Sequence, residues 1–128
     1  MTWSQYLFSF DGRIGRAWFW YFSLAMFVVF GGLYMVLGMM MFASMSDPNS
    51  TGPGAGASIF GLVVMVLGLA AIWPALAVQA KRWHDVDKSA WWILIGLIPF
   101  VGGLIALVFN GFIAGTPGPN RFGEGPMA

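Results

Sequence analysis

The chain has 128 residues, of which 59% are hydrophobic and 9% are Asp, Glu, Lys or Arg, and its formal net charge is +1. Soluble domains carry roughly a quarter charged residues, so this composition excludes an ordinary soluble globular protein. The small net charge provides no broad basic surface, which argues against nucleic acid as a partner. The chain has no cysteine, so disulfides and thiolate metal sites are excluded.

The N-terminal segment, residues 1–16, has the pattern of a short amphipathic helix. Trp3, Leu7 and Phe10 recur at helical spacing, with polar residues elsewhere around the turn. A helix of this kind lies in the headgroup layer with its apolar side toward the acyl chains. The sequence therefore predicts a short interfacial helix before the first long apolar run.

Three long intervals without Asp, Glu, Lys or Arg follow this segment. A bilayer core of about 30 Å requires roughly 20 apolar residues in a helix. Suitable runs occupy about residues 17–42, 58–80 and 91–114. These continuous runs lack the alternation of barrel strands. The sequence therefore predicts an all-α membrane protein in which three transmembrane helices form a single domain, residues 1–128.

The third run contains Pro99, which is expected to kink the helix because proline lacks a backbone donor and crowds the preceding turn. If the chain instead turned back at Pro99, each half would hold about a dozen residues, too few to span. We therefore expect a complete crossing, which would place the tail, residues 115–128, on the far side of the membrane.

Lys and Arg collect in cytoplasmic loops of membrane proteins. They flank the first run at its start and fill the second connector, whereas the first connector carries only Asp47. The predicted orientation therefore has a cytoplasmic N-terminus and a periplasmic C-terminus. The positions of most tryptophans support this orientation, because indole rings favour the membrane–water interface. Those at the predicted cytoplasmic end are Trp18, Trp20, Trp83, Trp91 and Trp92.

Small residues share one face of the second run and one face of the third. Such residues allow close helix approach, within one chain or in a homo-oligomer. Asn110 continues the face of the third run and is expected to form an interhelical hydrogen bond. A transport path normally needs buried ionisable groups, which these runs lack. The predicted packing residues are Gly61, Gly68, Ala71, Ala75, Gly96, Gly103 and Ala106.

Half of the ionisable side chains lie in the segment 81–88, "KRWHDVDK". If the second helix continues into it, Asp85 can pair with Arg82 at i,i+3 or with Lys81 at i,i+4. Two interpretations remain open. The segment is either a topological anchor whose charges pair with each other and with lipid phosphates, or a site that recognises an anionic headgroup, a small ligand or a partner.

Catalysis is the poorer interpretation of this segment. His84 and Asp85 are adjacent in the sequence, so their side chains diverge on a helix and cannot form a catalytic pair by themselves. With one histidine and no cysteine, a zinc site is disfavoured. We predict no catalytic residue, no metal and no cofactor.

Two other segments carry charge that bears on this site. Arg13 and Arg16 precede the first run and should lie at the same membrane face as Asp85, so we expect an Arg13 or Arg16 contact with that carboxylate. The tail is rich in Gly and Pro around Asn120 and Arg121. It is interpreted either as a folded cap that presents Arg121 to a headgroup or partner, or as an irregular polar tail.

Three segments, "FDGRIGRAWFW" (10–20), "KRWHDVDKSAWW" (81–92) and "GTPGPNRFGEGP" (115–126), resemble the signature motifs of the domain of unknown function 805 family. The resemblance covers essentially the whole chain and implies a small bacterial inner-membrane protein of unassigned activity. Lys81, Trp83, Ala90 and Gly125 depart from the family pattern. The residues carried over by position are Gly12, Arg13, Arg16, Trp20, Arg82, His84, Asp85, Ser89, Trp92, Gly115, Asn120, Arg121, Gly123 and Pro126.

The preferred function is that of a non-enzymatic accessory or scaffold protein in the lipid bilayer, binding an anionic lipid or a membrane-protein partner. One alternative is a subunit of an oligomeric transporter or channel. The least favoured is a membrane enzyme acting through His84 and Asp85. The residues predicted to bind a ligand or partner are Arg13, Arg16, Arg82, His84, Asp85, Asn120 and Arg121.

Overall fold

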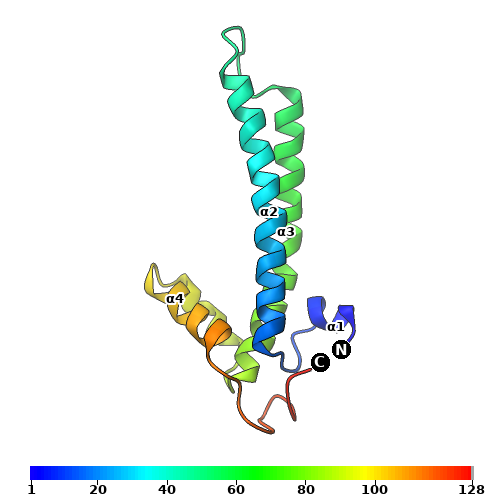
Figure 1. Ribbon diagram of the computed structural model, residues 1–128, viewed down its shortest axis with the longest axis vertical. Helices are drawn as coiled ribbons and strands as arrows, with labels where there is room; N and C mark the ends of the chain where they lie inside the picture. The colour runs from blue at the N-terminus through cyan, green and yellow to red at the C-terminus, as the bar shows by residue number, and fades with distance from the viewer. Residues whose placement is uncertain (128) are drawn as a thin grey trace. The chain divides into compact units, whose positions relative to one another are not determined.

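The computed structural model describes residues 1–127, and its regular elements over this range are all helical (Figure 1). Two of these helices are long and apolar enough to cross a membrane, and they occur where the sequence predicts the first two spans. The elements are α1 (Trp3–Phe8), α2 (Arg16–Met45), α3 (Gly54–Asp85), the 3-10 helix η1 (Ala90–Leu97), α4 (Val101–Leu107) and the π-helix η2 (Val108–Phe112).

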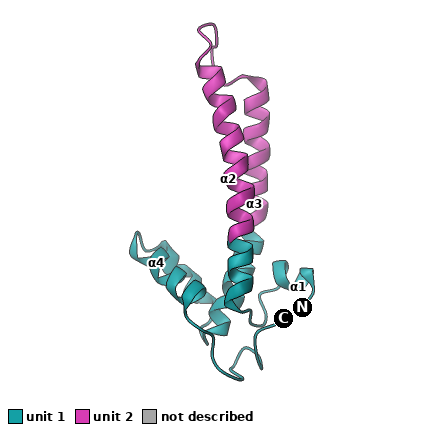
Figure 2. Ribbon diagram, viewed as in Figure 1, with its two compact units in different colours: residues 1–23, 72–128 teal, residues 24–71 magenta. Residues whose placement is uncertain are grey.

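The chain forms two compact units (Figure 2). Unit 2, residues 24–71, is an antiparallel pair made of the second part of α2 and the first part of α3. Small residues of α3 face large side chains of α2 there. A Cβ atom on Gly61 would lie 3.6 Å from Leu37, and one on Gly68 would lie 3.9 Å from Phe30. These are ordinary van der Waals distances, so both positions lie at the contact between α2 and α3 but an alanine would also fit there.

Unit 1 contains residues 1–23 and the chain from residue 72 onward. Its N-terminal helix α1 begins with a capping box, in which Thr2 and Gln5 satisfy each other's backbone donors. Its Tyr6 side chain is buried with Ile14 and Val78 in the core of the unit. Burial disfavours the phenolate and raises the pKa of Tyr6 above its usual value near 10.

The structure does not confirm the third span. Residues 90–112 form a helical hairpin, in which η1 leads to a tight turn and α4 with η2 runs back (Figure 1). At the turn Phe100 has φ +66°, a left-handed conformation, directly after Pro99. The backbones then touch, because a Cβ atom on Gly102 would lie 1.8 Å from the carbonyl oxygen of Ile95. Pro99 therefore lies at a chain reversal instead of a kink.

The placement predicted for the tail was wrong for the same reason. The hairpin returns the chain to its starting point, and the tail packs on the N-terminal segment. The amide of Met127 donates to the carbonyl of Arg13 at 2.7 Å, and that of Thr116 donates to the carbonyl of Asp85 at 2.7 Å. Residues in direct hydrogen bonding cannot lie on opposite sides of a bilayer about 30 Å thick. The tail and the N-terminal segment therefore share one side.

Candidate functional site

The three sequence motifs meet in one structure, which we call the polar cap: residues 10–16, 81–89 and 110–127. Its centre is the carboxylate of Asp85 at the C-terminal end of α3. Arg13 Nε lies 3.0 Å from Asp85 Oδ1, and Arg82 Nη1 lies 2.7 Å from Asp85 Oδ2. All three side chains are buried. The expected contact with Asp85 is therefore confirmed for Arg13, and the i,i+3 pair with Arg82 is confirmed as well.

Arg13 uses its remaining donors to hold the tail. Its Nη1 atom donates to the carbonyl oxygens of Gly118 at 2.8 Å and Gly123 at 3.2 Å, and its Nη2 atom donates to that of Thr116 at 2.7 Å. The planar guanidinium presents donors in several directions at once. One side chain from the N-terminal segment therefore fixes three points of the tail relative to Asp85.

Arg82 and Arg16 bind the C-terminal end of η2. Arg82 Nε donates to the carbonyl of Asn110 at 2.6 Å, and Arg82 Nη2 donates to that of Ile113. Arg16 is exposed and does not reach Asp85; its Nη1 atom donates to the carbonyl of Phe112 at 3.0 Å. The last carbonyls of a helix lack partners inside it and carry partial negative charge. The two arginines therefore anchor the end of the hairpin.

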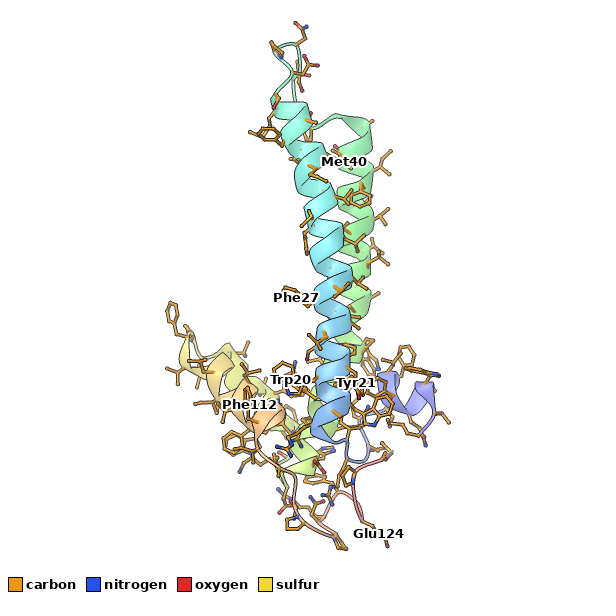
Figure 3. The ribbon with its side chains drawn as sticks, in the orientation of Figure 1. Trp20, Tyr21, Phe27, Met40, Phe112 and Glu124 are labelled. Carbon is orange, nitrogen blue, oxygen red and sulfur yellow. The ribbon has the colours of Figure 1, made fainter. Side chains whose placement is uncertain are left out.

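The indole of Trp20 completes this anchor. Its Nε1 atom donates to the carbonyl of Gly111 at 2.9 Å, and its ring lies edge-on to Phe112 with centroids 5.7 Å apart. Figure 3 shows Trp20 and Phe112 next to each other. A Cβ atom on Gly111 would lie 2.8 Å from the indole, so this close approach depends on glycine.

Lys81 has a role that the sequence did not indicate. Instead of pairing with Asp85, its buried ammonium donates to the carbonyls of Gln5 at 2.9 Å and Tyr6 at 2.8 Å, and also to that of Ser9. These are carbonyls at the C-terminal end of α1, where a lysine is favourable. Lys81 therefore fastens α1 to α3. The signal in the sequence for this contact is weak. It consists of a helix C-terminus without a cap and a lysine far along the chain that could satisfy its carbonyls.

His84 also serves the packing of the cap. Its Nδ1 atom lies 2.9 Å from the carbonyl of Gly12, and its ring stacks on Phe122 with centroids 4.0 Å apart. Asn120 donates to the backbone carbonyl of His84 at 2.9 Å. The imidazole thus faces a carbonyl and an aromatic ring, and its neighbour Asp85 is held by two arginines. Within residues 1–127 there is also no group of three His, Cys, Asp or Glu side chains placed to hold a metal.

Arg121, like Arg16, is on the surface. Its Nε atom lies 3.4 Å from Asp87 Oδ1, and both side chains are largely exposed. An exposed pair of this kind contributes little to stability. The structure therefore separates the predicted site residues into a buried set around Asp85 and an exposed set that includes Arg16 and Arg121.

Gly115 is the point at which the tail passes Asp85. A Cβ atom there would lie 2.1 Å from Asp85 Oδ2, which the ion pairs hold in place. We expect Gly115→Ala to lower the free energy of unfolding by about 2 kcal/mol, because overpacking displaces the tail or the carboxylate. Thermal unfolding in detergent measures this, with Gly125→Ala as the control, since nothing lies within 4 Å of that Cβ position. Equal melting temperatures for the two variants would contradict the geometry.

Two long apolar helices joined to a cap that holds all six Lys and Arg residues define a multi-pass helical membrane protein with its positive charge on one side. The chain belongs to the family described as protein of unknown function DUF805, whose family model matches residues 7–124. The resemblance inferred from the three motifs is thereby confirmed.

Several proteins of Escherichia coli (strain K12) are similar to this chain. The inner membrane protein YhaH is 42% identical over 120 residues, which cover 91% of this chain and 86% of YhaH. The inner membrane protein YhaI is 33% identical, with coverage of 91% and 85%. The uncharacterized protein YiiR is 33% identical, with coverage of 97% and 90%. No solved structure matches the chain. Together with the two apolar helices, these relatives indicate a bacterial inner-membrane location.

Proposed function

We propose that the protein is a non-enzymatic accessory protein that holds a membrane-protein partner against the exposed surface of its polar cap. The supporting observation is the use of the buried cations. Arg13, Lys81 and Arg82 are fully buried, and their contacts are Asp85 and backbone carbonyls. Groups engaged in this way build a rigid platform, whereas a catalytic or headgroup site would need donors aimed outward.

The surface that remains for a partner carries both signs of charge. Arg16 and Arg121 are exposed, and so are the acidic side chains of Asp11, Asp87 and Glu124. Glu124 lies on the tail, away from the helices (Figure 3). An anionic bilayer surface attracts clusters of basic residues and repels acidic ones. A mixed surface on a fixed loop is better suited to the rim of a protein interface, where complementary charges set partner choice.

The cap is placed in the cytoplasm in this proposal. The tail contributes Arg121 to the same side as the other Lys and Arg residues, whereas the connector between α2 and α3 carries only Asp47. Positive residues near the ends of spans favour the cytoplasm. With two spans and a hairpin, both termini would then be cytoplasmic.

Native mass spectrometry of the protein released gently from its own membrane tests the partner. We expect a membrane protein to accompany the wild type and to be depleted about tenfold or more in an Arg121→Glu/Glu124→Lys variant, because like charges then face each other across the interface. The control is Asp47→Lys in the other connector, which should retain the partner. A bare protein, or one accompanied only by lipid, would contradict the proposal.

A further inference from the structure

The hairpin of residues 90–112 exposes large apolar side chains on both of its arms. The exposed fraction is 95% for Phe100 at the turn, 78% for Leu97 and 64% for Leu104. No Asp, Glu, Lys or Arg occurs between residues 89 and 120. A helical element that is apolar on all sides belongs in a core or in lipid, and a protein groove would cover only one side of it.

The turn of the hairpin satisfies much of its own backbone. The amide of Ile98 donates to the carbonyl of Ile95 at 3.1 Å, that of Val101 to Pro99 at 2.7 Å, and that of Gly102 to Ile98 at 3.1 Å. Pro99 has no amide hydrogen to satisfy. Backbone that enters the hydrocarbon must pair its polar groups internally, and these three bonds supply part of that pairing.

The length of each arm matches one leaflet. The eight residues of η1 rise about 2.0 Å each, so this arm is about 16 Å long. The twelve residues of the returning arm, Val101–Phe112, rise about 1.5 Å each, so this arm is about 18 Å long. Half of a hydrocarbon core of about 30 Å is about 15 Å. Each arm is therefore too short to cross and long enough to reach the middle.

The base of the hairpin differs from its tip. Trp83 stacks on Trp92 with ring centroids 5.9 Å apart, and the ammonium of Lys88 lies 4.8 Å from the centroid of the Trp92 ring. Indole and lysine side chains together are typical of the membrane–water interface. The polar cap with its ion pairs lies at this same end, through the contacts of Arg82 and Trp20 with η2.

We propose that the hairpin of residues 90–112 is a re-entrant element, inserted tip-first into the acyl chains of the leaflet next to the polar cap. Phe100 lies deepest, and Trp91 and Trp92 lie at the headgroups. The ligand of this surface is the acyl-chain layer of one leaflet. This inference requires only the membrane location and is independent of the partner proposed above.

The absence of cysteine allows a direct test with single-cysteine variants of the full chain in liposomes. Bimane is attached to Phe100→Cys, to Trp91→Cys, and to two controls: Leu69→Cys, exposed at the middle of the second apolar run on α3, and Glu124→Cys on the tail. Quenching is measured with lipids that carry a nitroxide either deep or shallow in the acyl chain.

We expect Phe100→Cys to be quenched more by the deep nitroxide, as is expected for Leu69→Cys, and Trp91→Cys more by the shallow one. Before labelling, Phe100→Cys should react with an impermeant maleimide about tenfold more slowly than Glu124→Cys, because water is excluded from the hydrocarbon. Three results would overturn the proposal. In the first, the impermeant maleimide labels Phe100→Cys rapidly. In the second, Phe100→Cys is protected because it lies against another copy of the chain, shown by cross-linking, and neither nitroxide lipid quenches it. In the third, Asp11→Cys and Glu124→Cys are labelled from opposite sides of the membrane.

Discussion

Asp85→Asn is expected to lower the free energy of unfolding by about 3–5 kcal/mol, the range measured when one partner of a buried ion pair is removed. The carboxylate is the only buried acid among residues 1–127, and it faces Arg13 and Arg82 with the charge of Lys81 also buried nearby. Asparagine keeps the size of the side chain but leaves these cations without a counter-charge. The amide oxygen of asparagine could still accept from one arginine, but its NH2 group is a donor and would face the other arginine, which would be left with backbone carbonyls alone.

The matched control is Asp87→Asn, two residues further along the chain. Asp87 pairs with Arg121 at 3.4 Å on the surface, where such pairs are worth about 0–1 kcal/mol. Its backbone has φ +60°, a conformation that asparagine also tolerates. Thermal and denaturant unfolding in detergent should therefore separate the two variants clearly. Losses of similar size would mean that Asp85 is not the buried counter-charge of the cap.

The sequence was sufficient to predict α2 and α3, because a span is determined by the length of an apolar run, and composition reports that directly. It also predicted that Arg13 or Arg16 would contact Asp85, and the structure has Arg13 in that position. A chain with few charges, collected at one membrane face, leaves a buried carboxylate few possible partners. The pairing followed from scarcity of charge, without any knowledge of the tertiary fold.

The path of residues 91–114 could not be obtained in the same way. Hydropathy reports that a segment lies in lipid, and it is the same for a crossing and for a hairpin. Each half of this run is too short to span the bilayer, which favoured a crossing over a reversal at Pro99. The halves, however, need not span. Once the crossing was assumed, the tail was assigned to the wrong side, and its contacts with Arg13 and His84 could not be anticipated.

The small residues of the third run show most clearly what a sequence pattern cannot predict. The periodic pattern favoured Gly96 and Gly103 as packing positions, yet a Cβ atom on either meets nothing within 4 Å. The glycine that matters is Gly102, which is buried where the two arms touch. Its importance arises from one close approach of two backbones, and a single contact leaves no periodic signal in the sequence.

Gly102→Ala and Gly103→Ala should consequently have opposite effects, although the residues are neighbours in α4. At position 102 the new methyl group would lie 1.8 Å from the carbonyl oxygen of Ile95, so the arms must separate, and we expect a loss of about 3 kcal/mol. At position 103 the space is open, and alanine should stabilise the helix by up to about 1 kcal/mol.

Unfolding in detergent measures this difference, and bimane at Phe100→Cys in liposomes shows whether the opened hairpin still reaches the deep nitroxide. If residues 90–112 instead formed one straight helix, Ile95 and Gly102 would lie two turns apart along the axis. Alanine at 102 would then be as harmless as alanine at 103. Equal stability of the two variants would therefore favour a third crossing, whereas a loss confined to Gly102→Ala would support the contact between the two arms of the hairpin.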